Sequence, residues 1–229
     1  MNNDLFQPGS SQPQLPRYIV VEGPIGVGKT ALVKRMAEAF HYQSLLEQAD
    51  SNPFLEKFYE NRQQNALATQ LFFLFQRARL LEDLHQQDLF EPLRIADFMI
   101  EKDRLFAELL LADEEFKLYD MVYQRLAIEA PRPDLVIYLQ APPHILLQRI
   151  QQRGLRAEQS INVDYLEQIT EAYSRFFHFY DDAPLLIINA EQMDMIDDER
   201  IFRSLTDYML GIRSGRHYFN PSFYSEALL

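Results

Sequence analysis

Residues 23–30 combine three glycines with a lysine and a threonine, in the order Gly23, Pro24, Ile25, Gly26, Val27, Gly28, Lys29, Thr30. An apolar run precedes them at 17–22, and apolar residues recur at helical spacing after them, at 31–40. Glycines let successive main-chain N–H groups point into one concavity, where the N-terminus of a helix adds partial positive charge. This pattern predicts a phosphate-binding loop, in which Lys29 reaches the β- and γ-phosphates and the Thr30 hydroxyl can bind Mg²⁺.

Two acidic residues lie at the ends of predicted strands, which is where open α/β sheets bind their ligands. Asp97 follows a strand predicted at 93–96, and Glu47 ends a strand predicted at 43–47. Either carboxylate could accept the proton of a hydroxyl group that attacks a phosphoryl group. The sequence leaves open which of the two is the base, and a loop carboxylate that caps a helix is the alternative for each.

Two pairs of polar residues have spacings that place both members on one helix face. Gln70 and Arg77 are two helical turns apart, and an amide with a guanidinium group suits recognition of the edge of a base. Arg149 and Arg153 are four residues apart and run into a polar segment, a layout suited to a mobile lid that brings cations to phosphates. An exposed helix surface is the alternative for the second pair.

Strand and helix patterns alternate along the chain. We predict strands at 17–22, 43–47, 93–96, 134–139 and 185–189, a helix that opens at 52–54, and further helices at 31–40, 65–87, 100–111, 113–129, 143–153, 163–180 and 197–210. The nearly continuous apolar run at 134–139 is typical of a strand buried on both faces of a parallel sheet. The alternation predicts a three-layer α/β fold around a parallel five-stranded sheet.

The composition fits one domain with an aromatic core, because 47% of the 229 residues are hydrophobic and 17 Phe and 12 Tyr are among them. We place this domain at 17–210, after a disordered lead-in at 1–16 and before a tail at 211–229 whose structure the sequence does not indicate. The formal net charge of −12 argues against binding to a nucleic-acid backbone. A small anion complexed by Mg²⁺ remains compatible with it.

Location and assembly can also be read from the sequence. The chain has no cysteine, which excludes disulfides and thiolate metal sites and fits the reducing cytoplasm. It has neither a signal-peptide pattern nor an apolar run of membrane-spanning length, so we expect a soluble protein. The predicted helix at 65–87 is apolar on several faces, which indicates burial against a second subunit in a homodimer.

The loop at 23–30, together with the segments 52–59, 70–77, 97–106 and 134–140, resembles the deoxynucleoside kinases, specifically the bacterial deoxyadenosine/deoxyguanosine kinase type. The combination is specific, whereas the loop alone is shared by many nucleotide-binding proteins. The resemblance implies a P-loop NTPase fold with a helical lid. It also implies transfer of the γ-phosphoryl group of ATP, with Mg²⁺, to the 5′-hydroxyl of a deoxynucleoside.

The resemblance implies catalytic roles for acids and for the lid arginines. Asp97 matches the catalytic acidic position of the family, and Glu47 matches a carboxylate that contacts the 5′-hydroxyl. The arginines at 149 and 153 would stabilise the transferring group. The chain departs from the family at two places: Phe98 stands where arginine is usual, and the lid reads Arg153-Gly154-Leu155-Arg156 where Arg-Gly-Arg is usual.

The resemblance also implies a set of residues that contact the nucleoside, namely Tyr59, Gln70, Arg77, Asp103 and Glu158. In this set Gln70 and Arg77 read the base, Asp103 pairs with the arginine, and Tyr59 and Glu158 hold the 3′-hydroxyl. Without the resemblance, the charged run at 102–104 would be typical of a solvated helix face.

We therefore expect an ATP-dependent kinase of nucleotide salvage that prefers deoxyadenosine or deoxyguanosine, because the thymidine-selective branch of the family lacks the Arg/Asp pair. A nucleoside monophosphate kinase is one alternative, which Phe98 disfavours because it removes a cation for the acceptor phosphate. A non-catalytic nucleotide-binding regulator is the other. The presence of Lys29, Thr30, Asp97 and Glu47 counts against the regulator.

Overall fold

The computed structural model of the chain describes residues 15–86, 93–126, 130–192 and 198–221. Strands and helices alternate within them in the predicted order, and the boundaries agree with the sequence prediction to within about three residues. Residues 1–14 of the expected lead-in at 1–16, and the expected helix ends at 87, 127–129 and 197, lie outside the described residues.

The centre of the fold is a parallel sheet with the strand order β2-β3-β1-β4-β5-β6. Its strands are β1 (Tyr18–Glu22), β2 (Gln43–Leu45), β3 (Arg94–Ala96), β4 (Leu135–Gln140), β5 (Leu185–Asn189) and β6 (Arg216–Phe219). Ile19 of β1 is paired with Ile95 of β3 on one side and with Leu135 of β4 on the other. All three side chains are almost fully buried, as expected for strands covered on both faces.

The sheet has six strands, so the prediction of five was wrong by one. The additional strand, β6, lies in the segment 211–229, which the sequence left without structure, and pairs in parallel with β5. Only Phe219 of its four residues is buried. An edge strand of this kind lacks the apolar run by which the inner strands were recognised, because one of its sides has no neighbouring strand.

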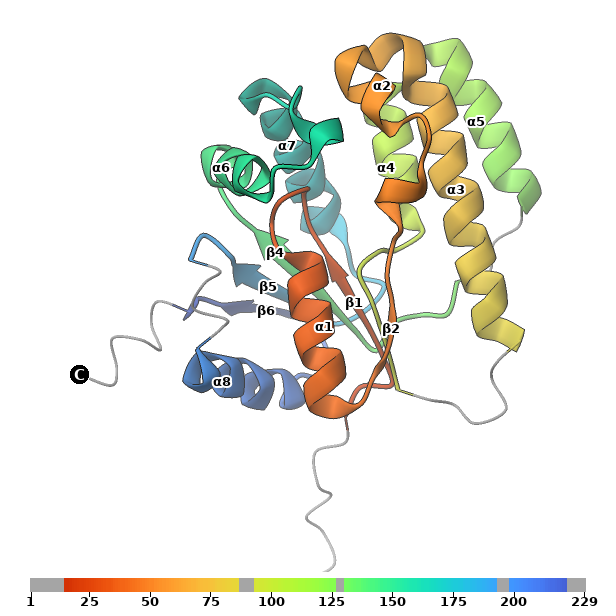
Figure 1. Cartoon of the computed structure of the whole chain (residues 1–229). Helices are drawn as coiled ribbons and strands as arrows, with labels where there is room; N and C mark the ends of the chain where they lie inside the picture. The colour runs from red at the N-terminus through yellow and green to blue at the C-terminus, as the bar shows by residue number, and fades with distance from the viewer. Residues whose placement is uncertain (1–14, 87–92, 127–129, 193–197, 222–229) are drawn as a thin grey trace, which may run out of the picture.

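Helices cover both faces of the sheet (Figure 1). They are α1 (Lys29–Phe40), α2 (Leu55–Glu60), α3 (Arg62–Gln86), α4 (Glu101–Leu110), α5 (Asp113–Leu126), α6 (Pro143–Arg153), α7 (Val163–Phe179) and α8 (Glu199–Leu210). On one face α1 packs on β1, β2 and β3, and α8 lies beside α1, where Arg35 pairs with Glu199 at 3.0 Å. On the opposite face α7 stacks the ring of Phe177 on Tyr138 of β4, with 4.2 Å between the centroids.

The parallel strands bring their carboxyl ends to one edge of the sheet, and the candidate site lies there. Glu22 ends β1, Asp97 follows β3 directly, and Glu47 lies two residues after the end of β2. The helices α2, α3 and α4 rise beside this edge, and α6 lies above the loop that joins β1 to α1 (Figure 1). Among the described helices, none is both long and apolar enough to cross a membrane.

Candidate active site

A cavity of about 300 Å³ opens at the carboxyl edge of the sheet, within the size range of small-molecule sites. Its lining includes most of the residues that the sequence singled out: Gly23, Ile25, Gly26, Gly28, Lys29, Thr30, Glu47, Tyr59, Gln70, Arg77, Asp97, Arg153 and Glu158. Asp103 and Arg149 are not part of the lining. The fold therefore places predicted phosphate-binding and nucleoside-binding residues around a single space.

The phosphate loop is shaped by its glycines. Gly26 has a φ of 81°, and a Cβ atom on it would lie 2.9 Å from the main-chain oxygen of Leu146 in α6. Gly28, with a φ of 104°, is the residue before α1. Glycine is needed at both positions, because a side chain strains the backbone at positive φ, and at Gly26 it would also collide with α6.

Lys29, the first residue of α1, turns back over the phosphate loop. Its ammonium group donates hydrogen bonds to the main-chain oxygens of Gly23, at 2.8 Å, and Pro24, at 3.3 Å. Burial lowers the pKa of Lys29 to about 8. The positive charge of Lys102 also lowers this pKa, whereas nearby carboxylates raise it. The ammonium group is thus poorly solvated, and a phosphate group would restore a strong partner for it.

Glu22 is fully buried and holds the start of the loop. Its carboxylate accepts hydrogen bonds from the N–H groups of Gly23 and Met99, each at 3.0 Å, and from the Tyr173 hydroxyl at 2.9 Å. These contacts tie β1 to the segment that follows β3 and to α7. Glu22 therefore orders the site without reaching the cavity, since it is not among the lining residues.

Asp97 connects the ends of β2 and β3 to the phosphate loop. One of its oxygens accepts a hydrogen bond from the Thr30 hydroxyl at 2.6 Å, and the other accepts one from the N–H of Glu47 at 2.7 Å. The Thr30 hydroxyl and the Asp97 carboxylate together offer oxygen ligands of the kind that hard metal ions prefer. Mg²⁺ in phosphoryl-transfer sites commonly uses one or two such protein ligands together with phosphates and water, so these residues fit that ion.

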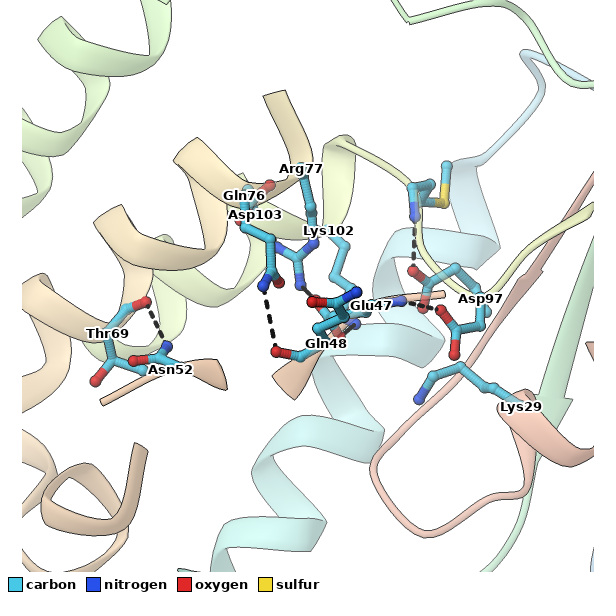
Figure 2. A network of polar contacts seen from close by, with 12 residues as sticks. Lys29, Glu47, Gln48, Asn52, Thr69, Gln76, Arg77, Asp97, Lys102 and Asp103 are labelled. Atoms are coloured by element: carbon cyan, nitrogen blue, oxygen red, sulfur yellow. Dashed lines mark hydrogen bonds and ion pairs between the residues drawn. The ribbon is translucent and has the colours of Figure 1, made fainter. Parts of the chain in front are cut away.

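Glu47 lies between the cations of two helices (Figure 2). Arg77 of α3 donates a hydrogen bond to one of its oxygens, and Lys102 of α4 donates to the other at 3.1 Å. Burial by itself would raise the pKa of Glu47, but the charges of Arg77 and Lys102 outweigh burial and lower it to about 2. Glu47 is therefore ionised at any physiological pH.

Arg77 also pairs with Asp103, which is fully buried. Burial raises the pKa of Asp103 to about 7, because the single ion pair with Arg77 does not compensate for the lost hydration. The Nε of Arg77 and the Oδ2 of Asp103 are buried and have no hydrogen-bond partner among the described residues. Gln70 lines the cavity from the same helix as Arg77, as their spacing predicted.

The lid pairs two predicted residues with each other. Arg153, at the end of α6, donates to both carboxylate oxygens of Glu158, at 2.7 and 2.6 Å. Tyr59 lines the same cavity. Arg149 lies apart from them and donates to the main-chain oxygen of Glu191 at 2.9 Å. The structure thus brings together Tyr59, Arg153 and Glu158, whereas Arg149 keeps its phosphate-binding role only as a prediction.

Lys102 is the charged cavity-lining residue that the sequence interpretation missed. Its charged neighbourhood indicated a solvated helix face, yet the structure buries Lys102, Asp103 and Ala107 on one stripe of α4. The signal was present in the spacing, because Met99 and Phe106 lie three to four residues away on the same face. Two charges on the apolar stripe of a helix require partners inside the protein, which here are Glu47 and Arg77.

Comparison with known proteins agrees with this geometry. The sequence profile of the deoxynucleoside kinase family matches residues 19–209. A deoxyguanosine kinase of Bacillus subtilis (strain 168) is 37% identical over 158 residues, which make up 68% of this chain and 76% of the relative. A deoxyadenosine/deoxycytidine kinase of the same organism is 28% identical over 204 residues, or 85% of this chain and 92% of the relative.

The fold also matches solved structures. The deoxyadenosine kinase from M. mycoides, with the products dCMP and a flexible dCDP bound, superimposes with a TM-score of 0.72 at 22% sequence identity. The match covers 83% of this chain and 99% of that one. At this level of identity the likeness concerns the fold.

Proposed function

The chain belongs to the deoxynucleoside kinase family, and we propose that it transfers the γ-phosphoryl group of ATP to the 5′-hydroxyl of a purine deoxynucleoside in nucleotide salvage. One observation carries the proposal: the ionised carboxylate of Glu47 shares a cavity with Lys29 and Thr30 of the phosphate loop. An anionic proton acceptor and a phosphate-binding cation at one site are what this reaction needs. We place the activity in the cytoplasm, because a chain without cysteine fits a reducing compartment.

Glu47 is the better placed of the two acids to accept the hydroxyl proton. Both acids already accept hydrogen bonds on both oxygens, but those of Asp97 come from the Thr30 hydroxyl and the Glu47 N–H and hold it beside the phosphate loop. Glu47 lies on the nucleoside side of the cavity, next to Arg77. In the loose transition state of phosphoryl transfer the attacking hydroxyl is only weakly bonded to phosphorus, so a weak but well-positioned carboxylate suffices as the base.

The phosphate side of the site neutralises charge on the donor. Lys29 can exchange its two main-chain partners for phosphate oxygens, and the main-chain N–H groups of the loop can bind the β-phosphate. Thr30 and Asp97 would hold Mg²⁺, which when bound supplies positive charge to the β- and γ-phosphates. Arg153 would bring a further cation from the lid, with Arg149 in a supporting position on the same helix.

The nucleoside side of the site favours deoxyguanosine and deoxyadenosine. Gln70 offers an amide to the base, and Arg77 offers donors that suit the acceptors of a purine edge. Asp103 acts through Arg77, because it is buried behind that residue. A thymine methyl group would lie against this charged pair without a matching contact. Tyr59 and Glu158 would hold the 3′-hydroxyl of the sugar.

We also propose that the protein is a homodimer formed through α3 and α5. These helices pack together at one side of the molecule and expose Phe75, Leu118 and Met121 by 51%, 49% and 66% (Figure 1). Exposed apolar residues on adjacent helices are typical of an interface between subunits. Phe75→Glu should give the mass of a monomer in light scattering, whereas Phe179→Glu, at a residue that is 76% exposed on α7, should stay dimeric. A wild-type monomer across micromolar concentrations would contradict the dimer.

The function can be tested by incubating the purified protein with Mg²⁺-ATP and each of the four deoxynucleosides and separating the products. We expect monophosphate from deoxyguanosine and deoxyadenosine, with kcat/KM at least about 100-fold above that for thymidine, because a site built for polar contacts rejects a base that leaves them unmade. Formation of no monophosphate from any of the four would overturn the proposal.

A further inference from the structure

Lys102 is a cavity-lining cation with donors to spare. Its side chain is 9% exposed and gives one hydrogen bond, to the Oε2 of Glu47 at 3.1 Å. An ammonium group carries three N–H donors. The part of the chain that the structure describes supplies no second acceptor for Lys102, although the ring of Phe106 lies 5.9 Å from its nitrogen. Two donors therefore remain for a partner that enters the cavity.

The position of Lys102 indicates which part of a substrate it would meet. Lys102 and Lys29 both line the cavity, and Glu47 lies beside Lys102 (Figure 2). Glu47 already partners Lys102, but two cations that line one cavity both attract a further anion that enters it. A phosphoryl group that passes from the phosphate loop to a hydroxyl beside Glu47 would be that anion.

Phe98 and Arg77, which also lie near this path, do not supply the same charge. Phe98, which follows Asp97, is apolar and fully buried. Arg77 is engaged by two carboxylates, those of Glu47 and Asp103. During the transfer, negative charge is spread over the three equatorial oxygens of the phosphoryl group, and a fixed cation stabilises that state without having to reorganise.

We propose that Lys102 is a catalytic residue, which contacts the γ-phosphoryl group during transfer while one of its N–H groups holds Glu47 toward the attacking hydroxyl. This inference rests on the proposed kinase function. It differs from a purely positioning role, in which Lys102 would act only through Glu47. The two roles make different predictions when Glu47 is itself changed.

The first test is a double-mutant cycle with Lys102→Met and Glu47→Gln. Lys102→Met removes the charge with little change in size, and should lower kcat about 100-fold with KM values for ATP and deoxyguanosine within about threefold of wild type. In the Glu47→Gln background it should still lower kcat at least about tenfold. No further loss in that background would show that Lys102 only positions Glu47, and would overturn the proposal. Lys117→Met, at an exposed lysine of α5, is the matched control and should keep full activity.

The second test measures binding instead of turnover. ADP has no γ-phosphoryl group, so Lys102→Met should bind ADP as the wild type does. With aluminium fluoride and deoxyguanosine added to imitate the transferring group, the variant should bind at least about tenfold more weakly than wild type. Equal affinity of both proteins for the mimic would refute the catalytic contact. If Lys102→Met fails to bind ADP, the affinities for ADP and for the mimic are measured with Lys102→Gln instead.

The outcomes separate this inference from the proposed function. A wild-type protein that phosphorylates no deoxynucleoside counts against the function itself. An active wild type with an equally active Lys102→Met variant counts against Lys102 alone. Lys102→Arg, which keeps the charge, should recover at least about a tenth of the wild-type kcat.

Discussion

The two ends of the cavity are built in different ways. The phosphate end comes from eight consecutive residues, 23–30, whose glycines shape the backbone and whose lysine contacts main-chain oxygens. The nucleoside end is made of side chains from five separate segments, in which Arg77 lies 30 residues from Glu47 and 26 from Asp103. The first is a local motif, and the second exists only after α3 and α4 have packed beside β2.

The electrostatics differ in the same way. At the phosphate end, Lys29 is bound by neutral carbonyl groups that a phosphate can replace. At the nucleoside end the charges neutralise one another, since Arg77 is shared by two carboxylates and Glu47 by two cations. A substitution at the first end should therefore affect one step of the reaction. One that breaks the Arg77–Asp103 pair at the second end leaves a buried partner unpaired and should affect several properties at once.

Removal of the phosphate-loop cation should have the largest effect. Lys29→Ala should lower kcat by about 1000-fold, because it deletes charge that neutralises the β- and γ-phosphates, while the melting temperature stays close to that of wild type. Lys34→Ala, at an exposed lysine on the same helix, should keep normal kinetics. Retention of more than about a tenth of kcat by Lys29→Ala would contradict the loop assignment.

Removal of the base should have the next largest effect. Glu47→Gln keeps the shape of the side chain but cannot take the proton, and should lower kcat about 100-fold. Single-turnover measurements would show whether the chemical step is affected. Glu60→Gln, at an exposed glutamate that ends α2, is the control. A larger loss of kcat in Asp97→Asn than in Glu47→Gln, unrelieved when the Mg²⁺ concentration is raised, would assign the base to Asp97 instead.

The nucleoside end should respond differently to single and double substitutions. Arg77→Met leaves the buried carboxylate of Asp103 without its cation and should lower the free energy of unfolding by about 3–5 kcal/mol. It should also lower the activity with every nucleoside. Arg77→Met with Asp103→Ala removes the pair together and should shift kcat/KM toward thymidine by at least about tenfold. The measurement is kcat/KM for all four deoxynucleosides. An unchanged order of preference in the double variant would show that the pair does not read the base.

A comparison of two glycines with the same backbone angle distinguishes the effect of backbone strain from the effect of steric crowding in the phosphate loop. Gly26 and Gly215 both have a φ of 81°, but a Cβ atom would lie 2.9 Å from a main-chain oxygen at Gly26 and would meet nothing within 4 Å at Gly215. Both alanine variants should lose about 1–2 kcal/mol to backbone strain. Only Gly26→Ala should also raise the KM for ATP, by about tenfold, because the loop must move away from α6. Equal KM values in the two variants would argue against this close packing.

The smallest effect should be a pH dependence of nucleoside binding. Burial raises the pKa of Asp103 to about 7, so the carboxylate is ionised above that pH and protonated below it. Protonation weakens its hold on Arg77, and the KM for deoxyguanosine should rise severalfold as the pH falls from about 8 to 6. Asp103→Asn should remove this dependence. Glu47, with a pKa of about 2, should add no acid limb in this range.

Most of the strands and helices could be predicted because their patterns are local. A buried parallel strand such as β4 is a continuous apolar run, and α6 was predicted with its observed ends. The edge strand β6 has one buried residue in four and no such pattern, so it was missed. Lys102 was missed for a related reason: local spacing places it on the apolar stripe of α4, but its partner Glu47 lies on another segment and is not visible from neighbouring residues.

The sequence by itself determined the phosphate loop, because eight adjacent residues carry both the backbone freedom and the cation that phosphate binding requires. It also determined that Gln70 and Arg77 share a helix face, since helical periodicity alone places them there. Only the tertiary structure decided which charged residues pair. Arg77 forms ion pairs with both Glu47 and Asp103, Lys102 pairs with Glu47, and Arg153 pairs with Glu158. The physical reason is range, because an ion pair needs its atoms within about 4 Å and residues far apart in sequence reach that distance only when the elements pack.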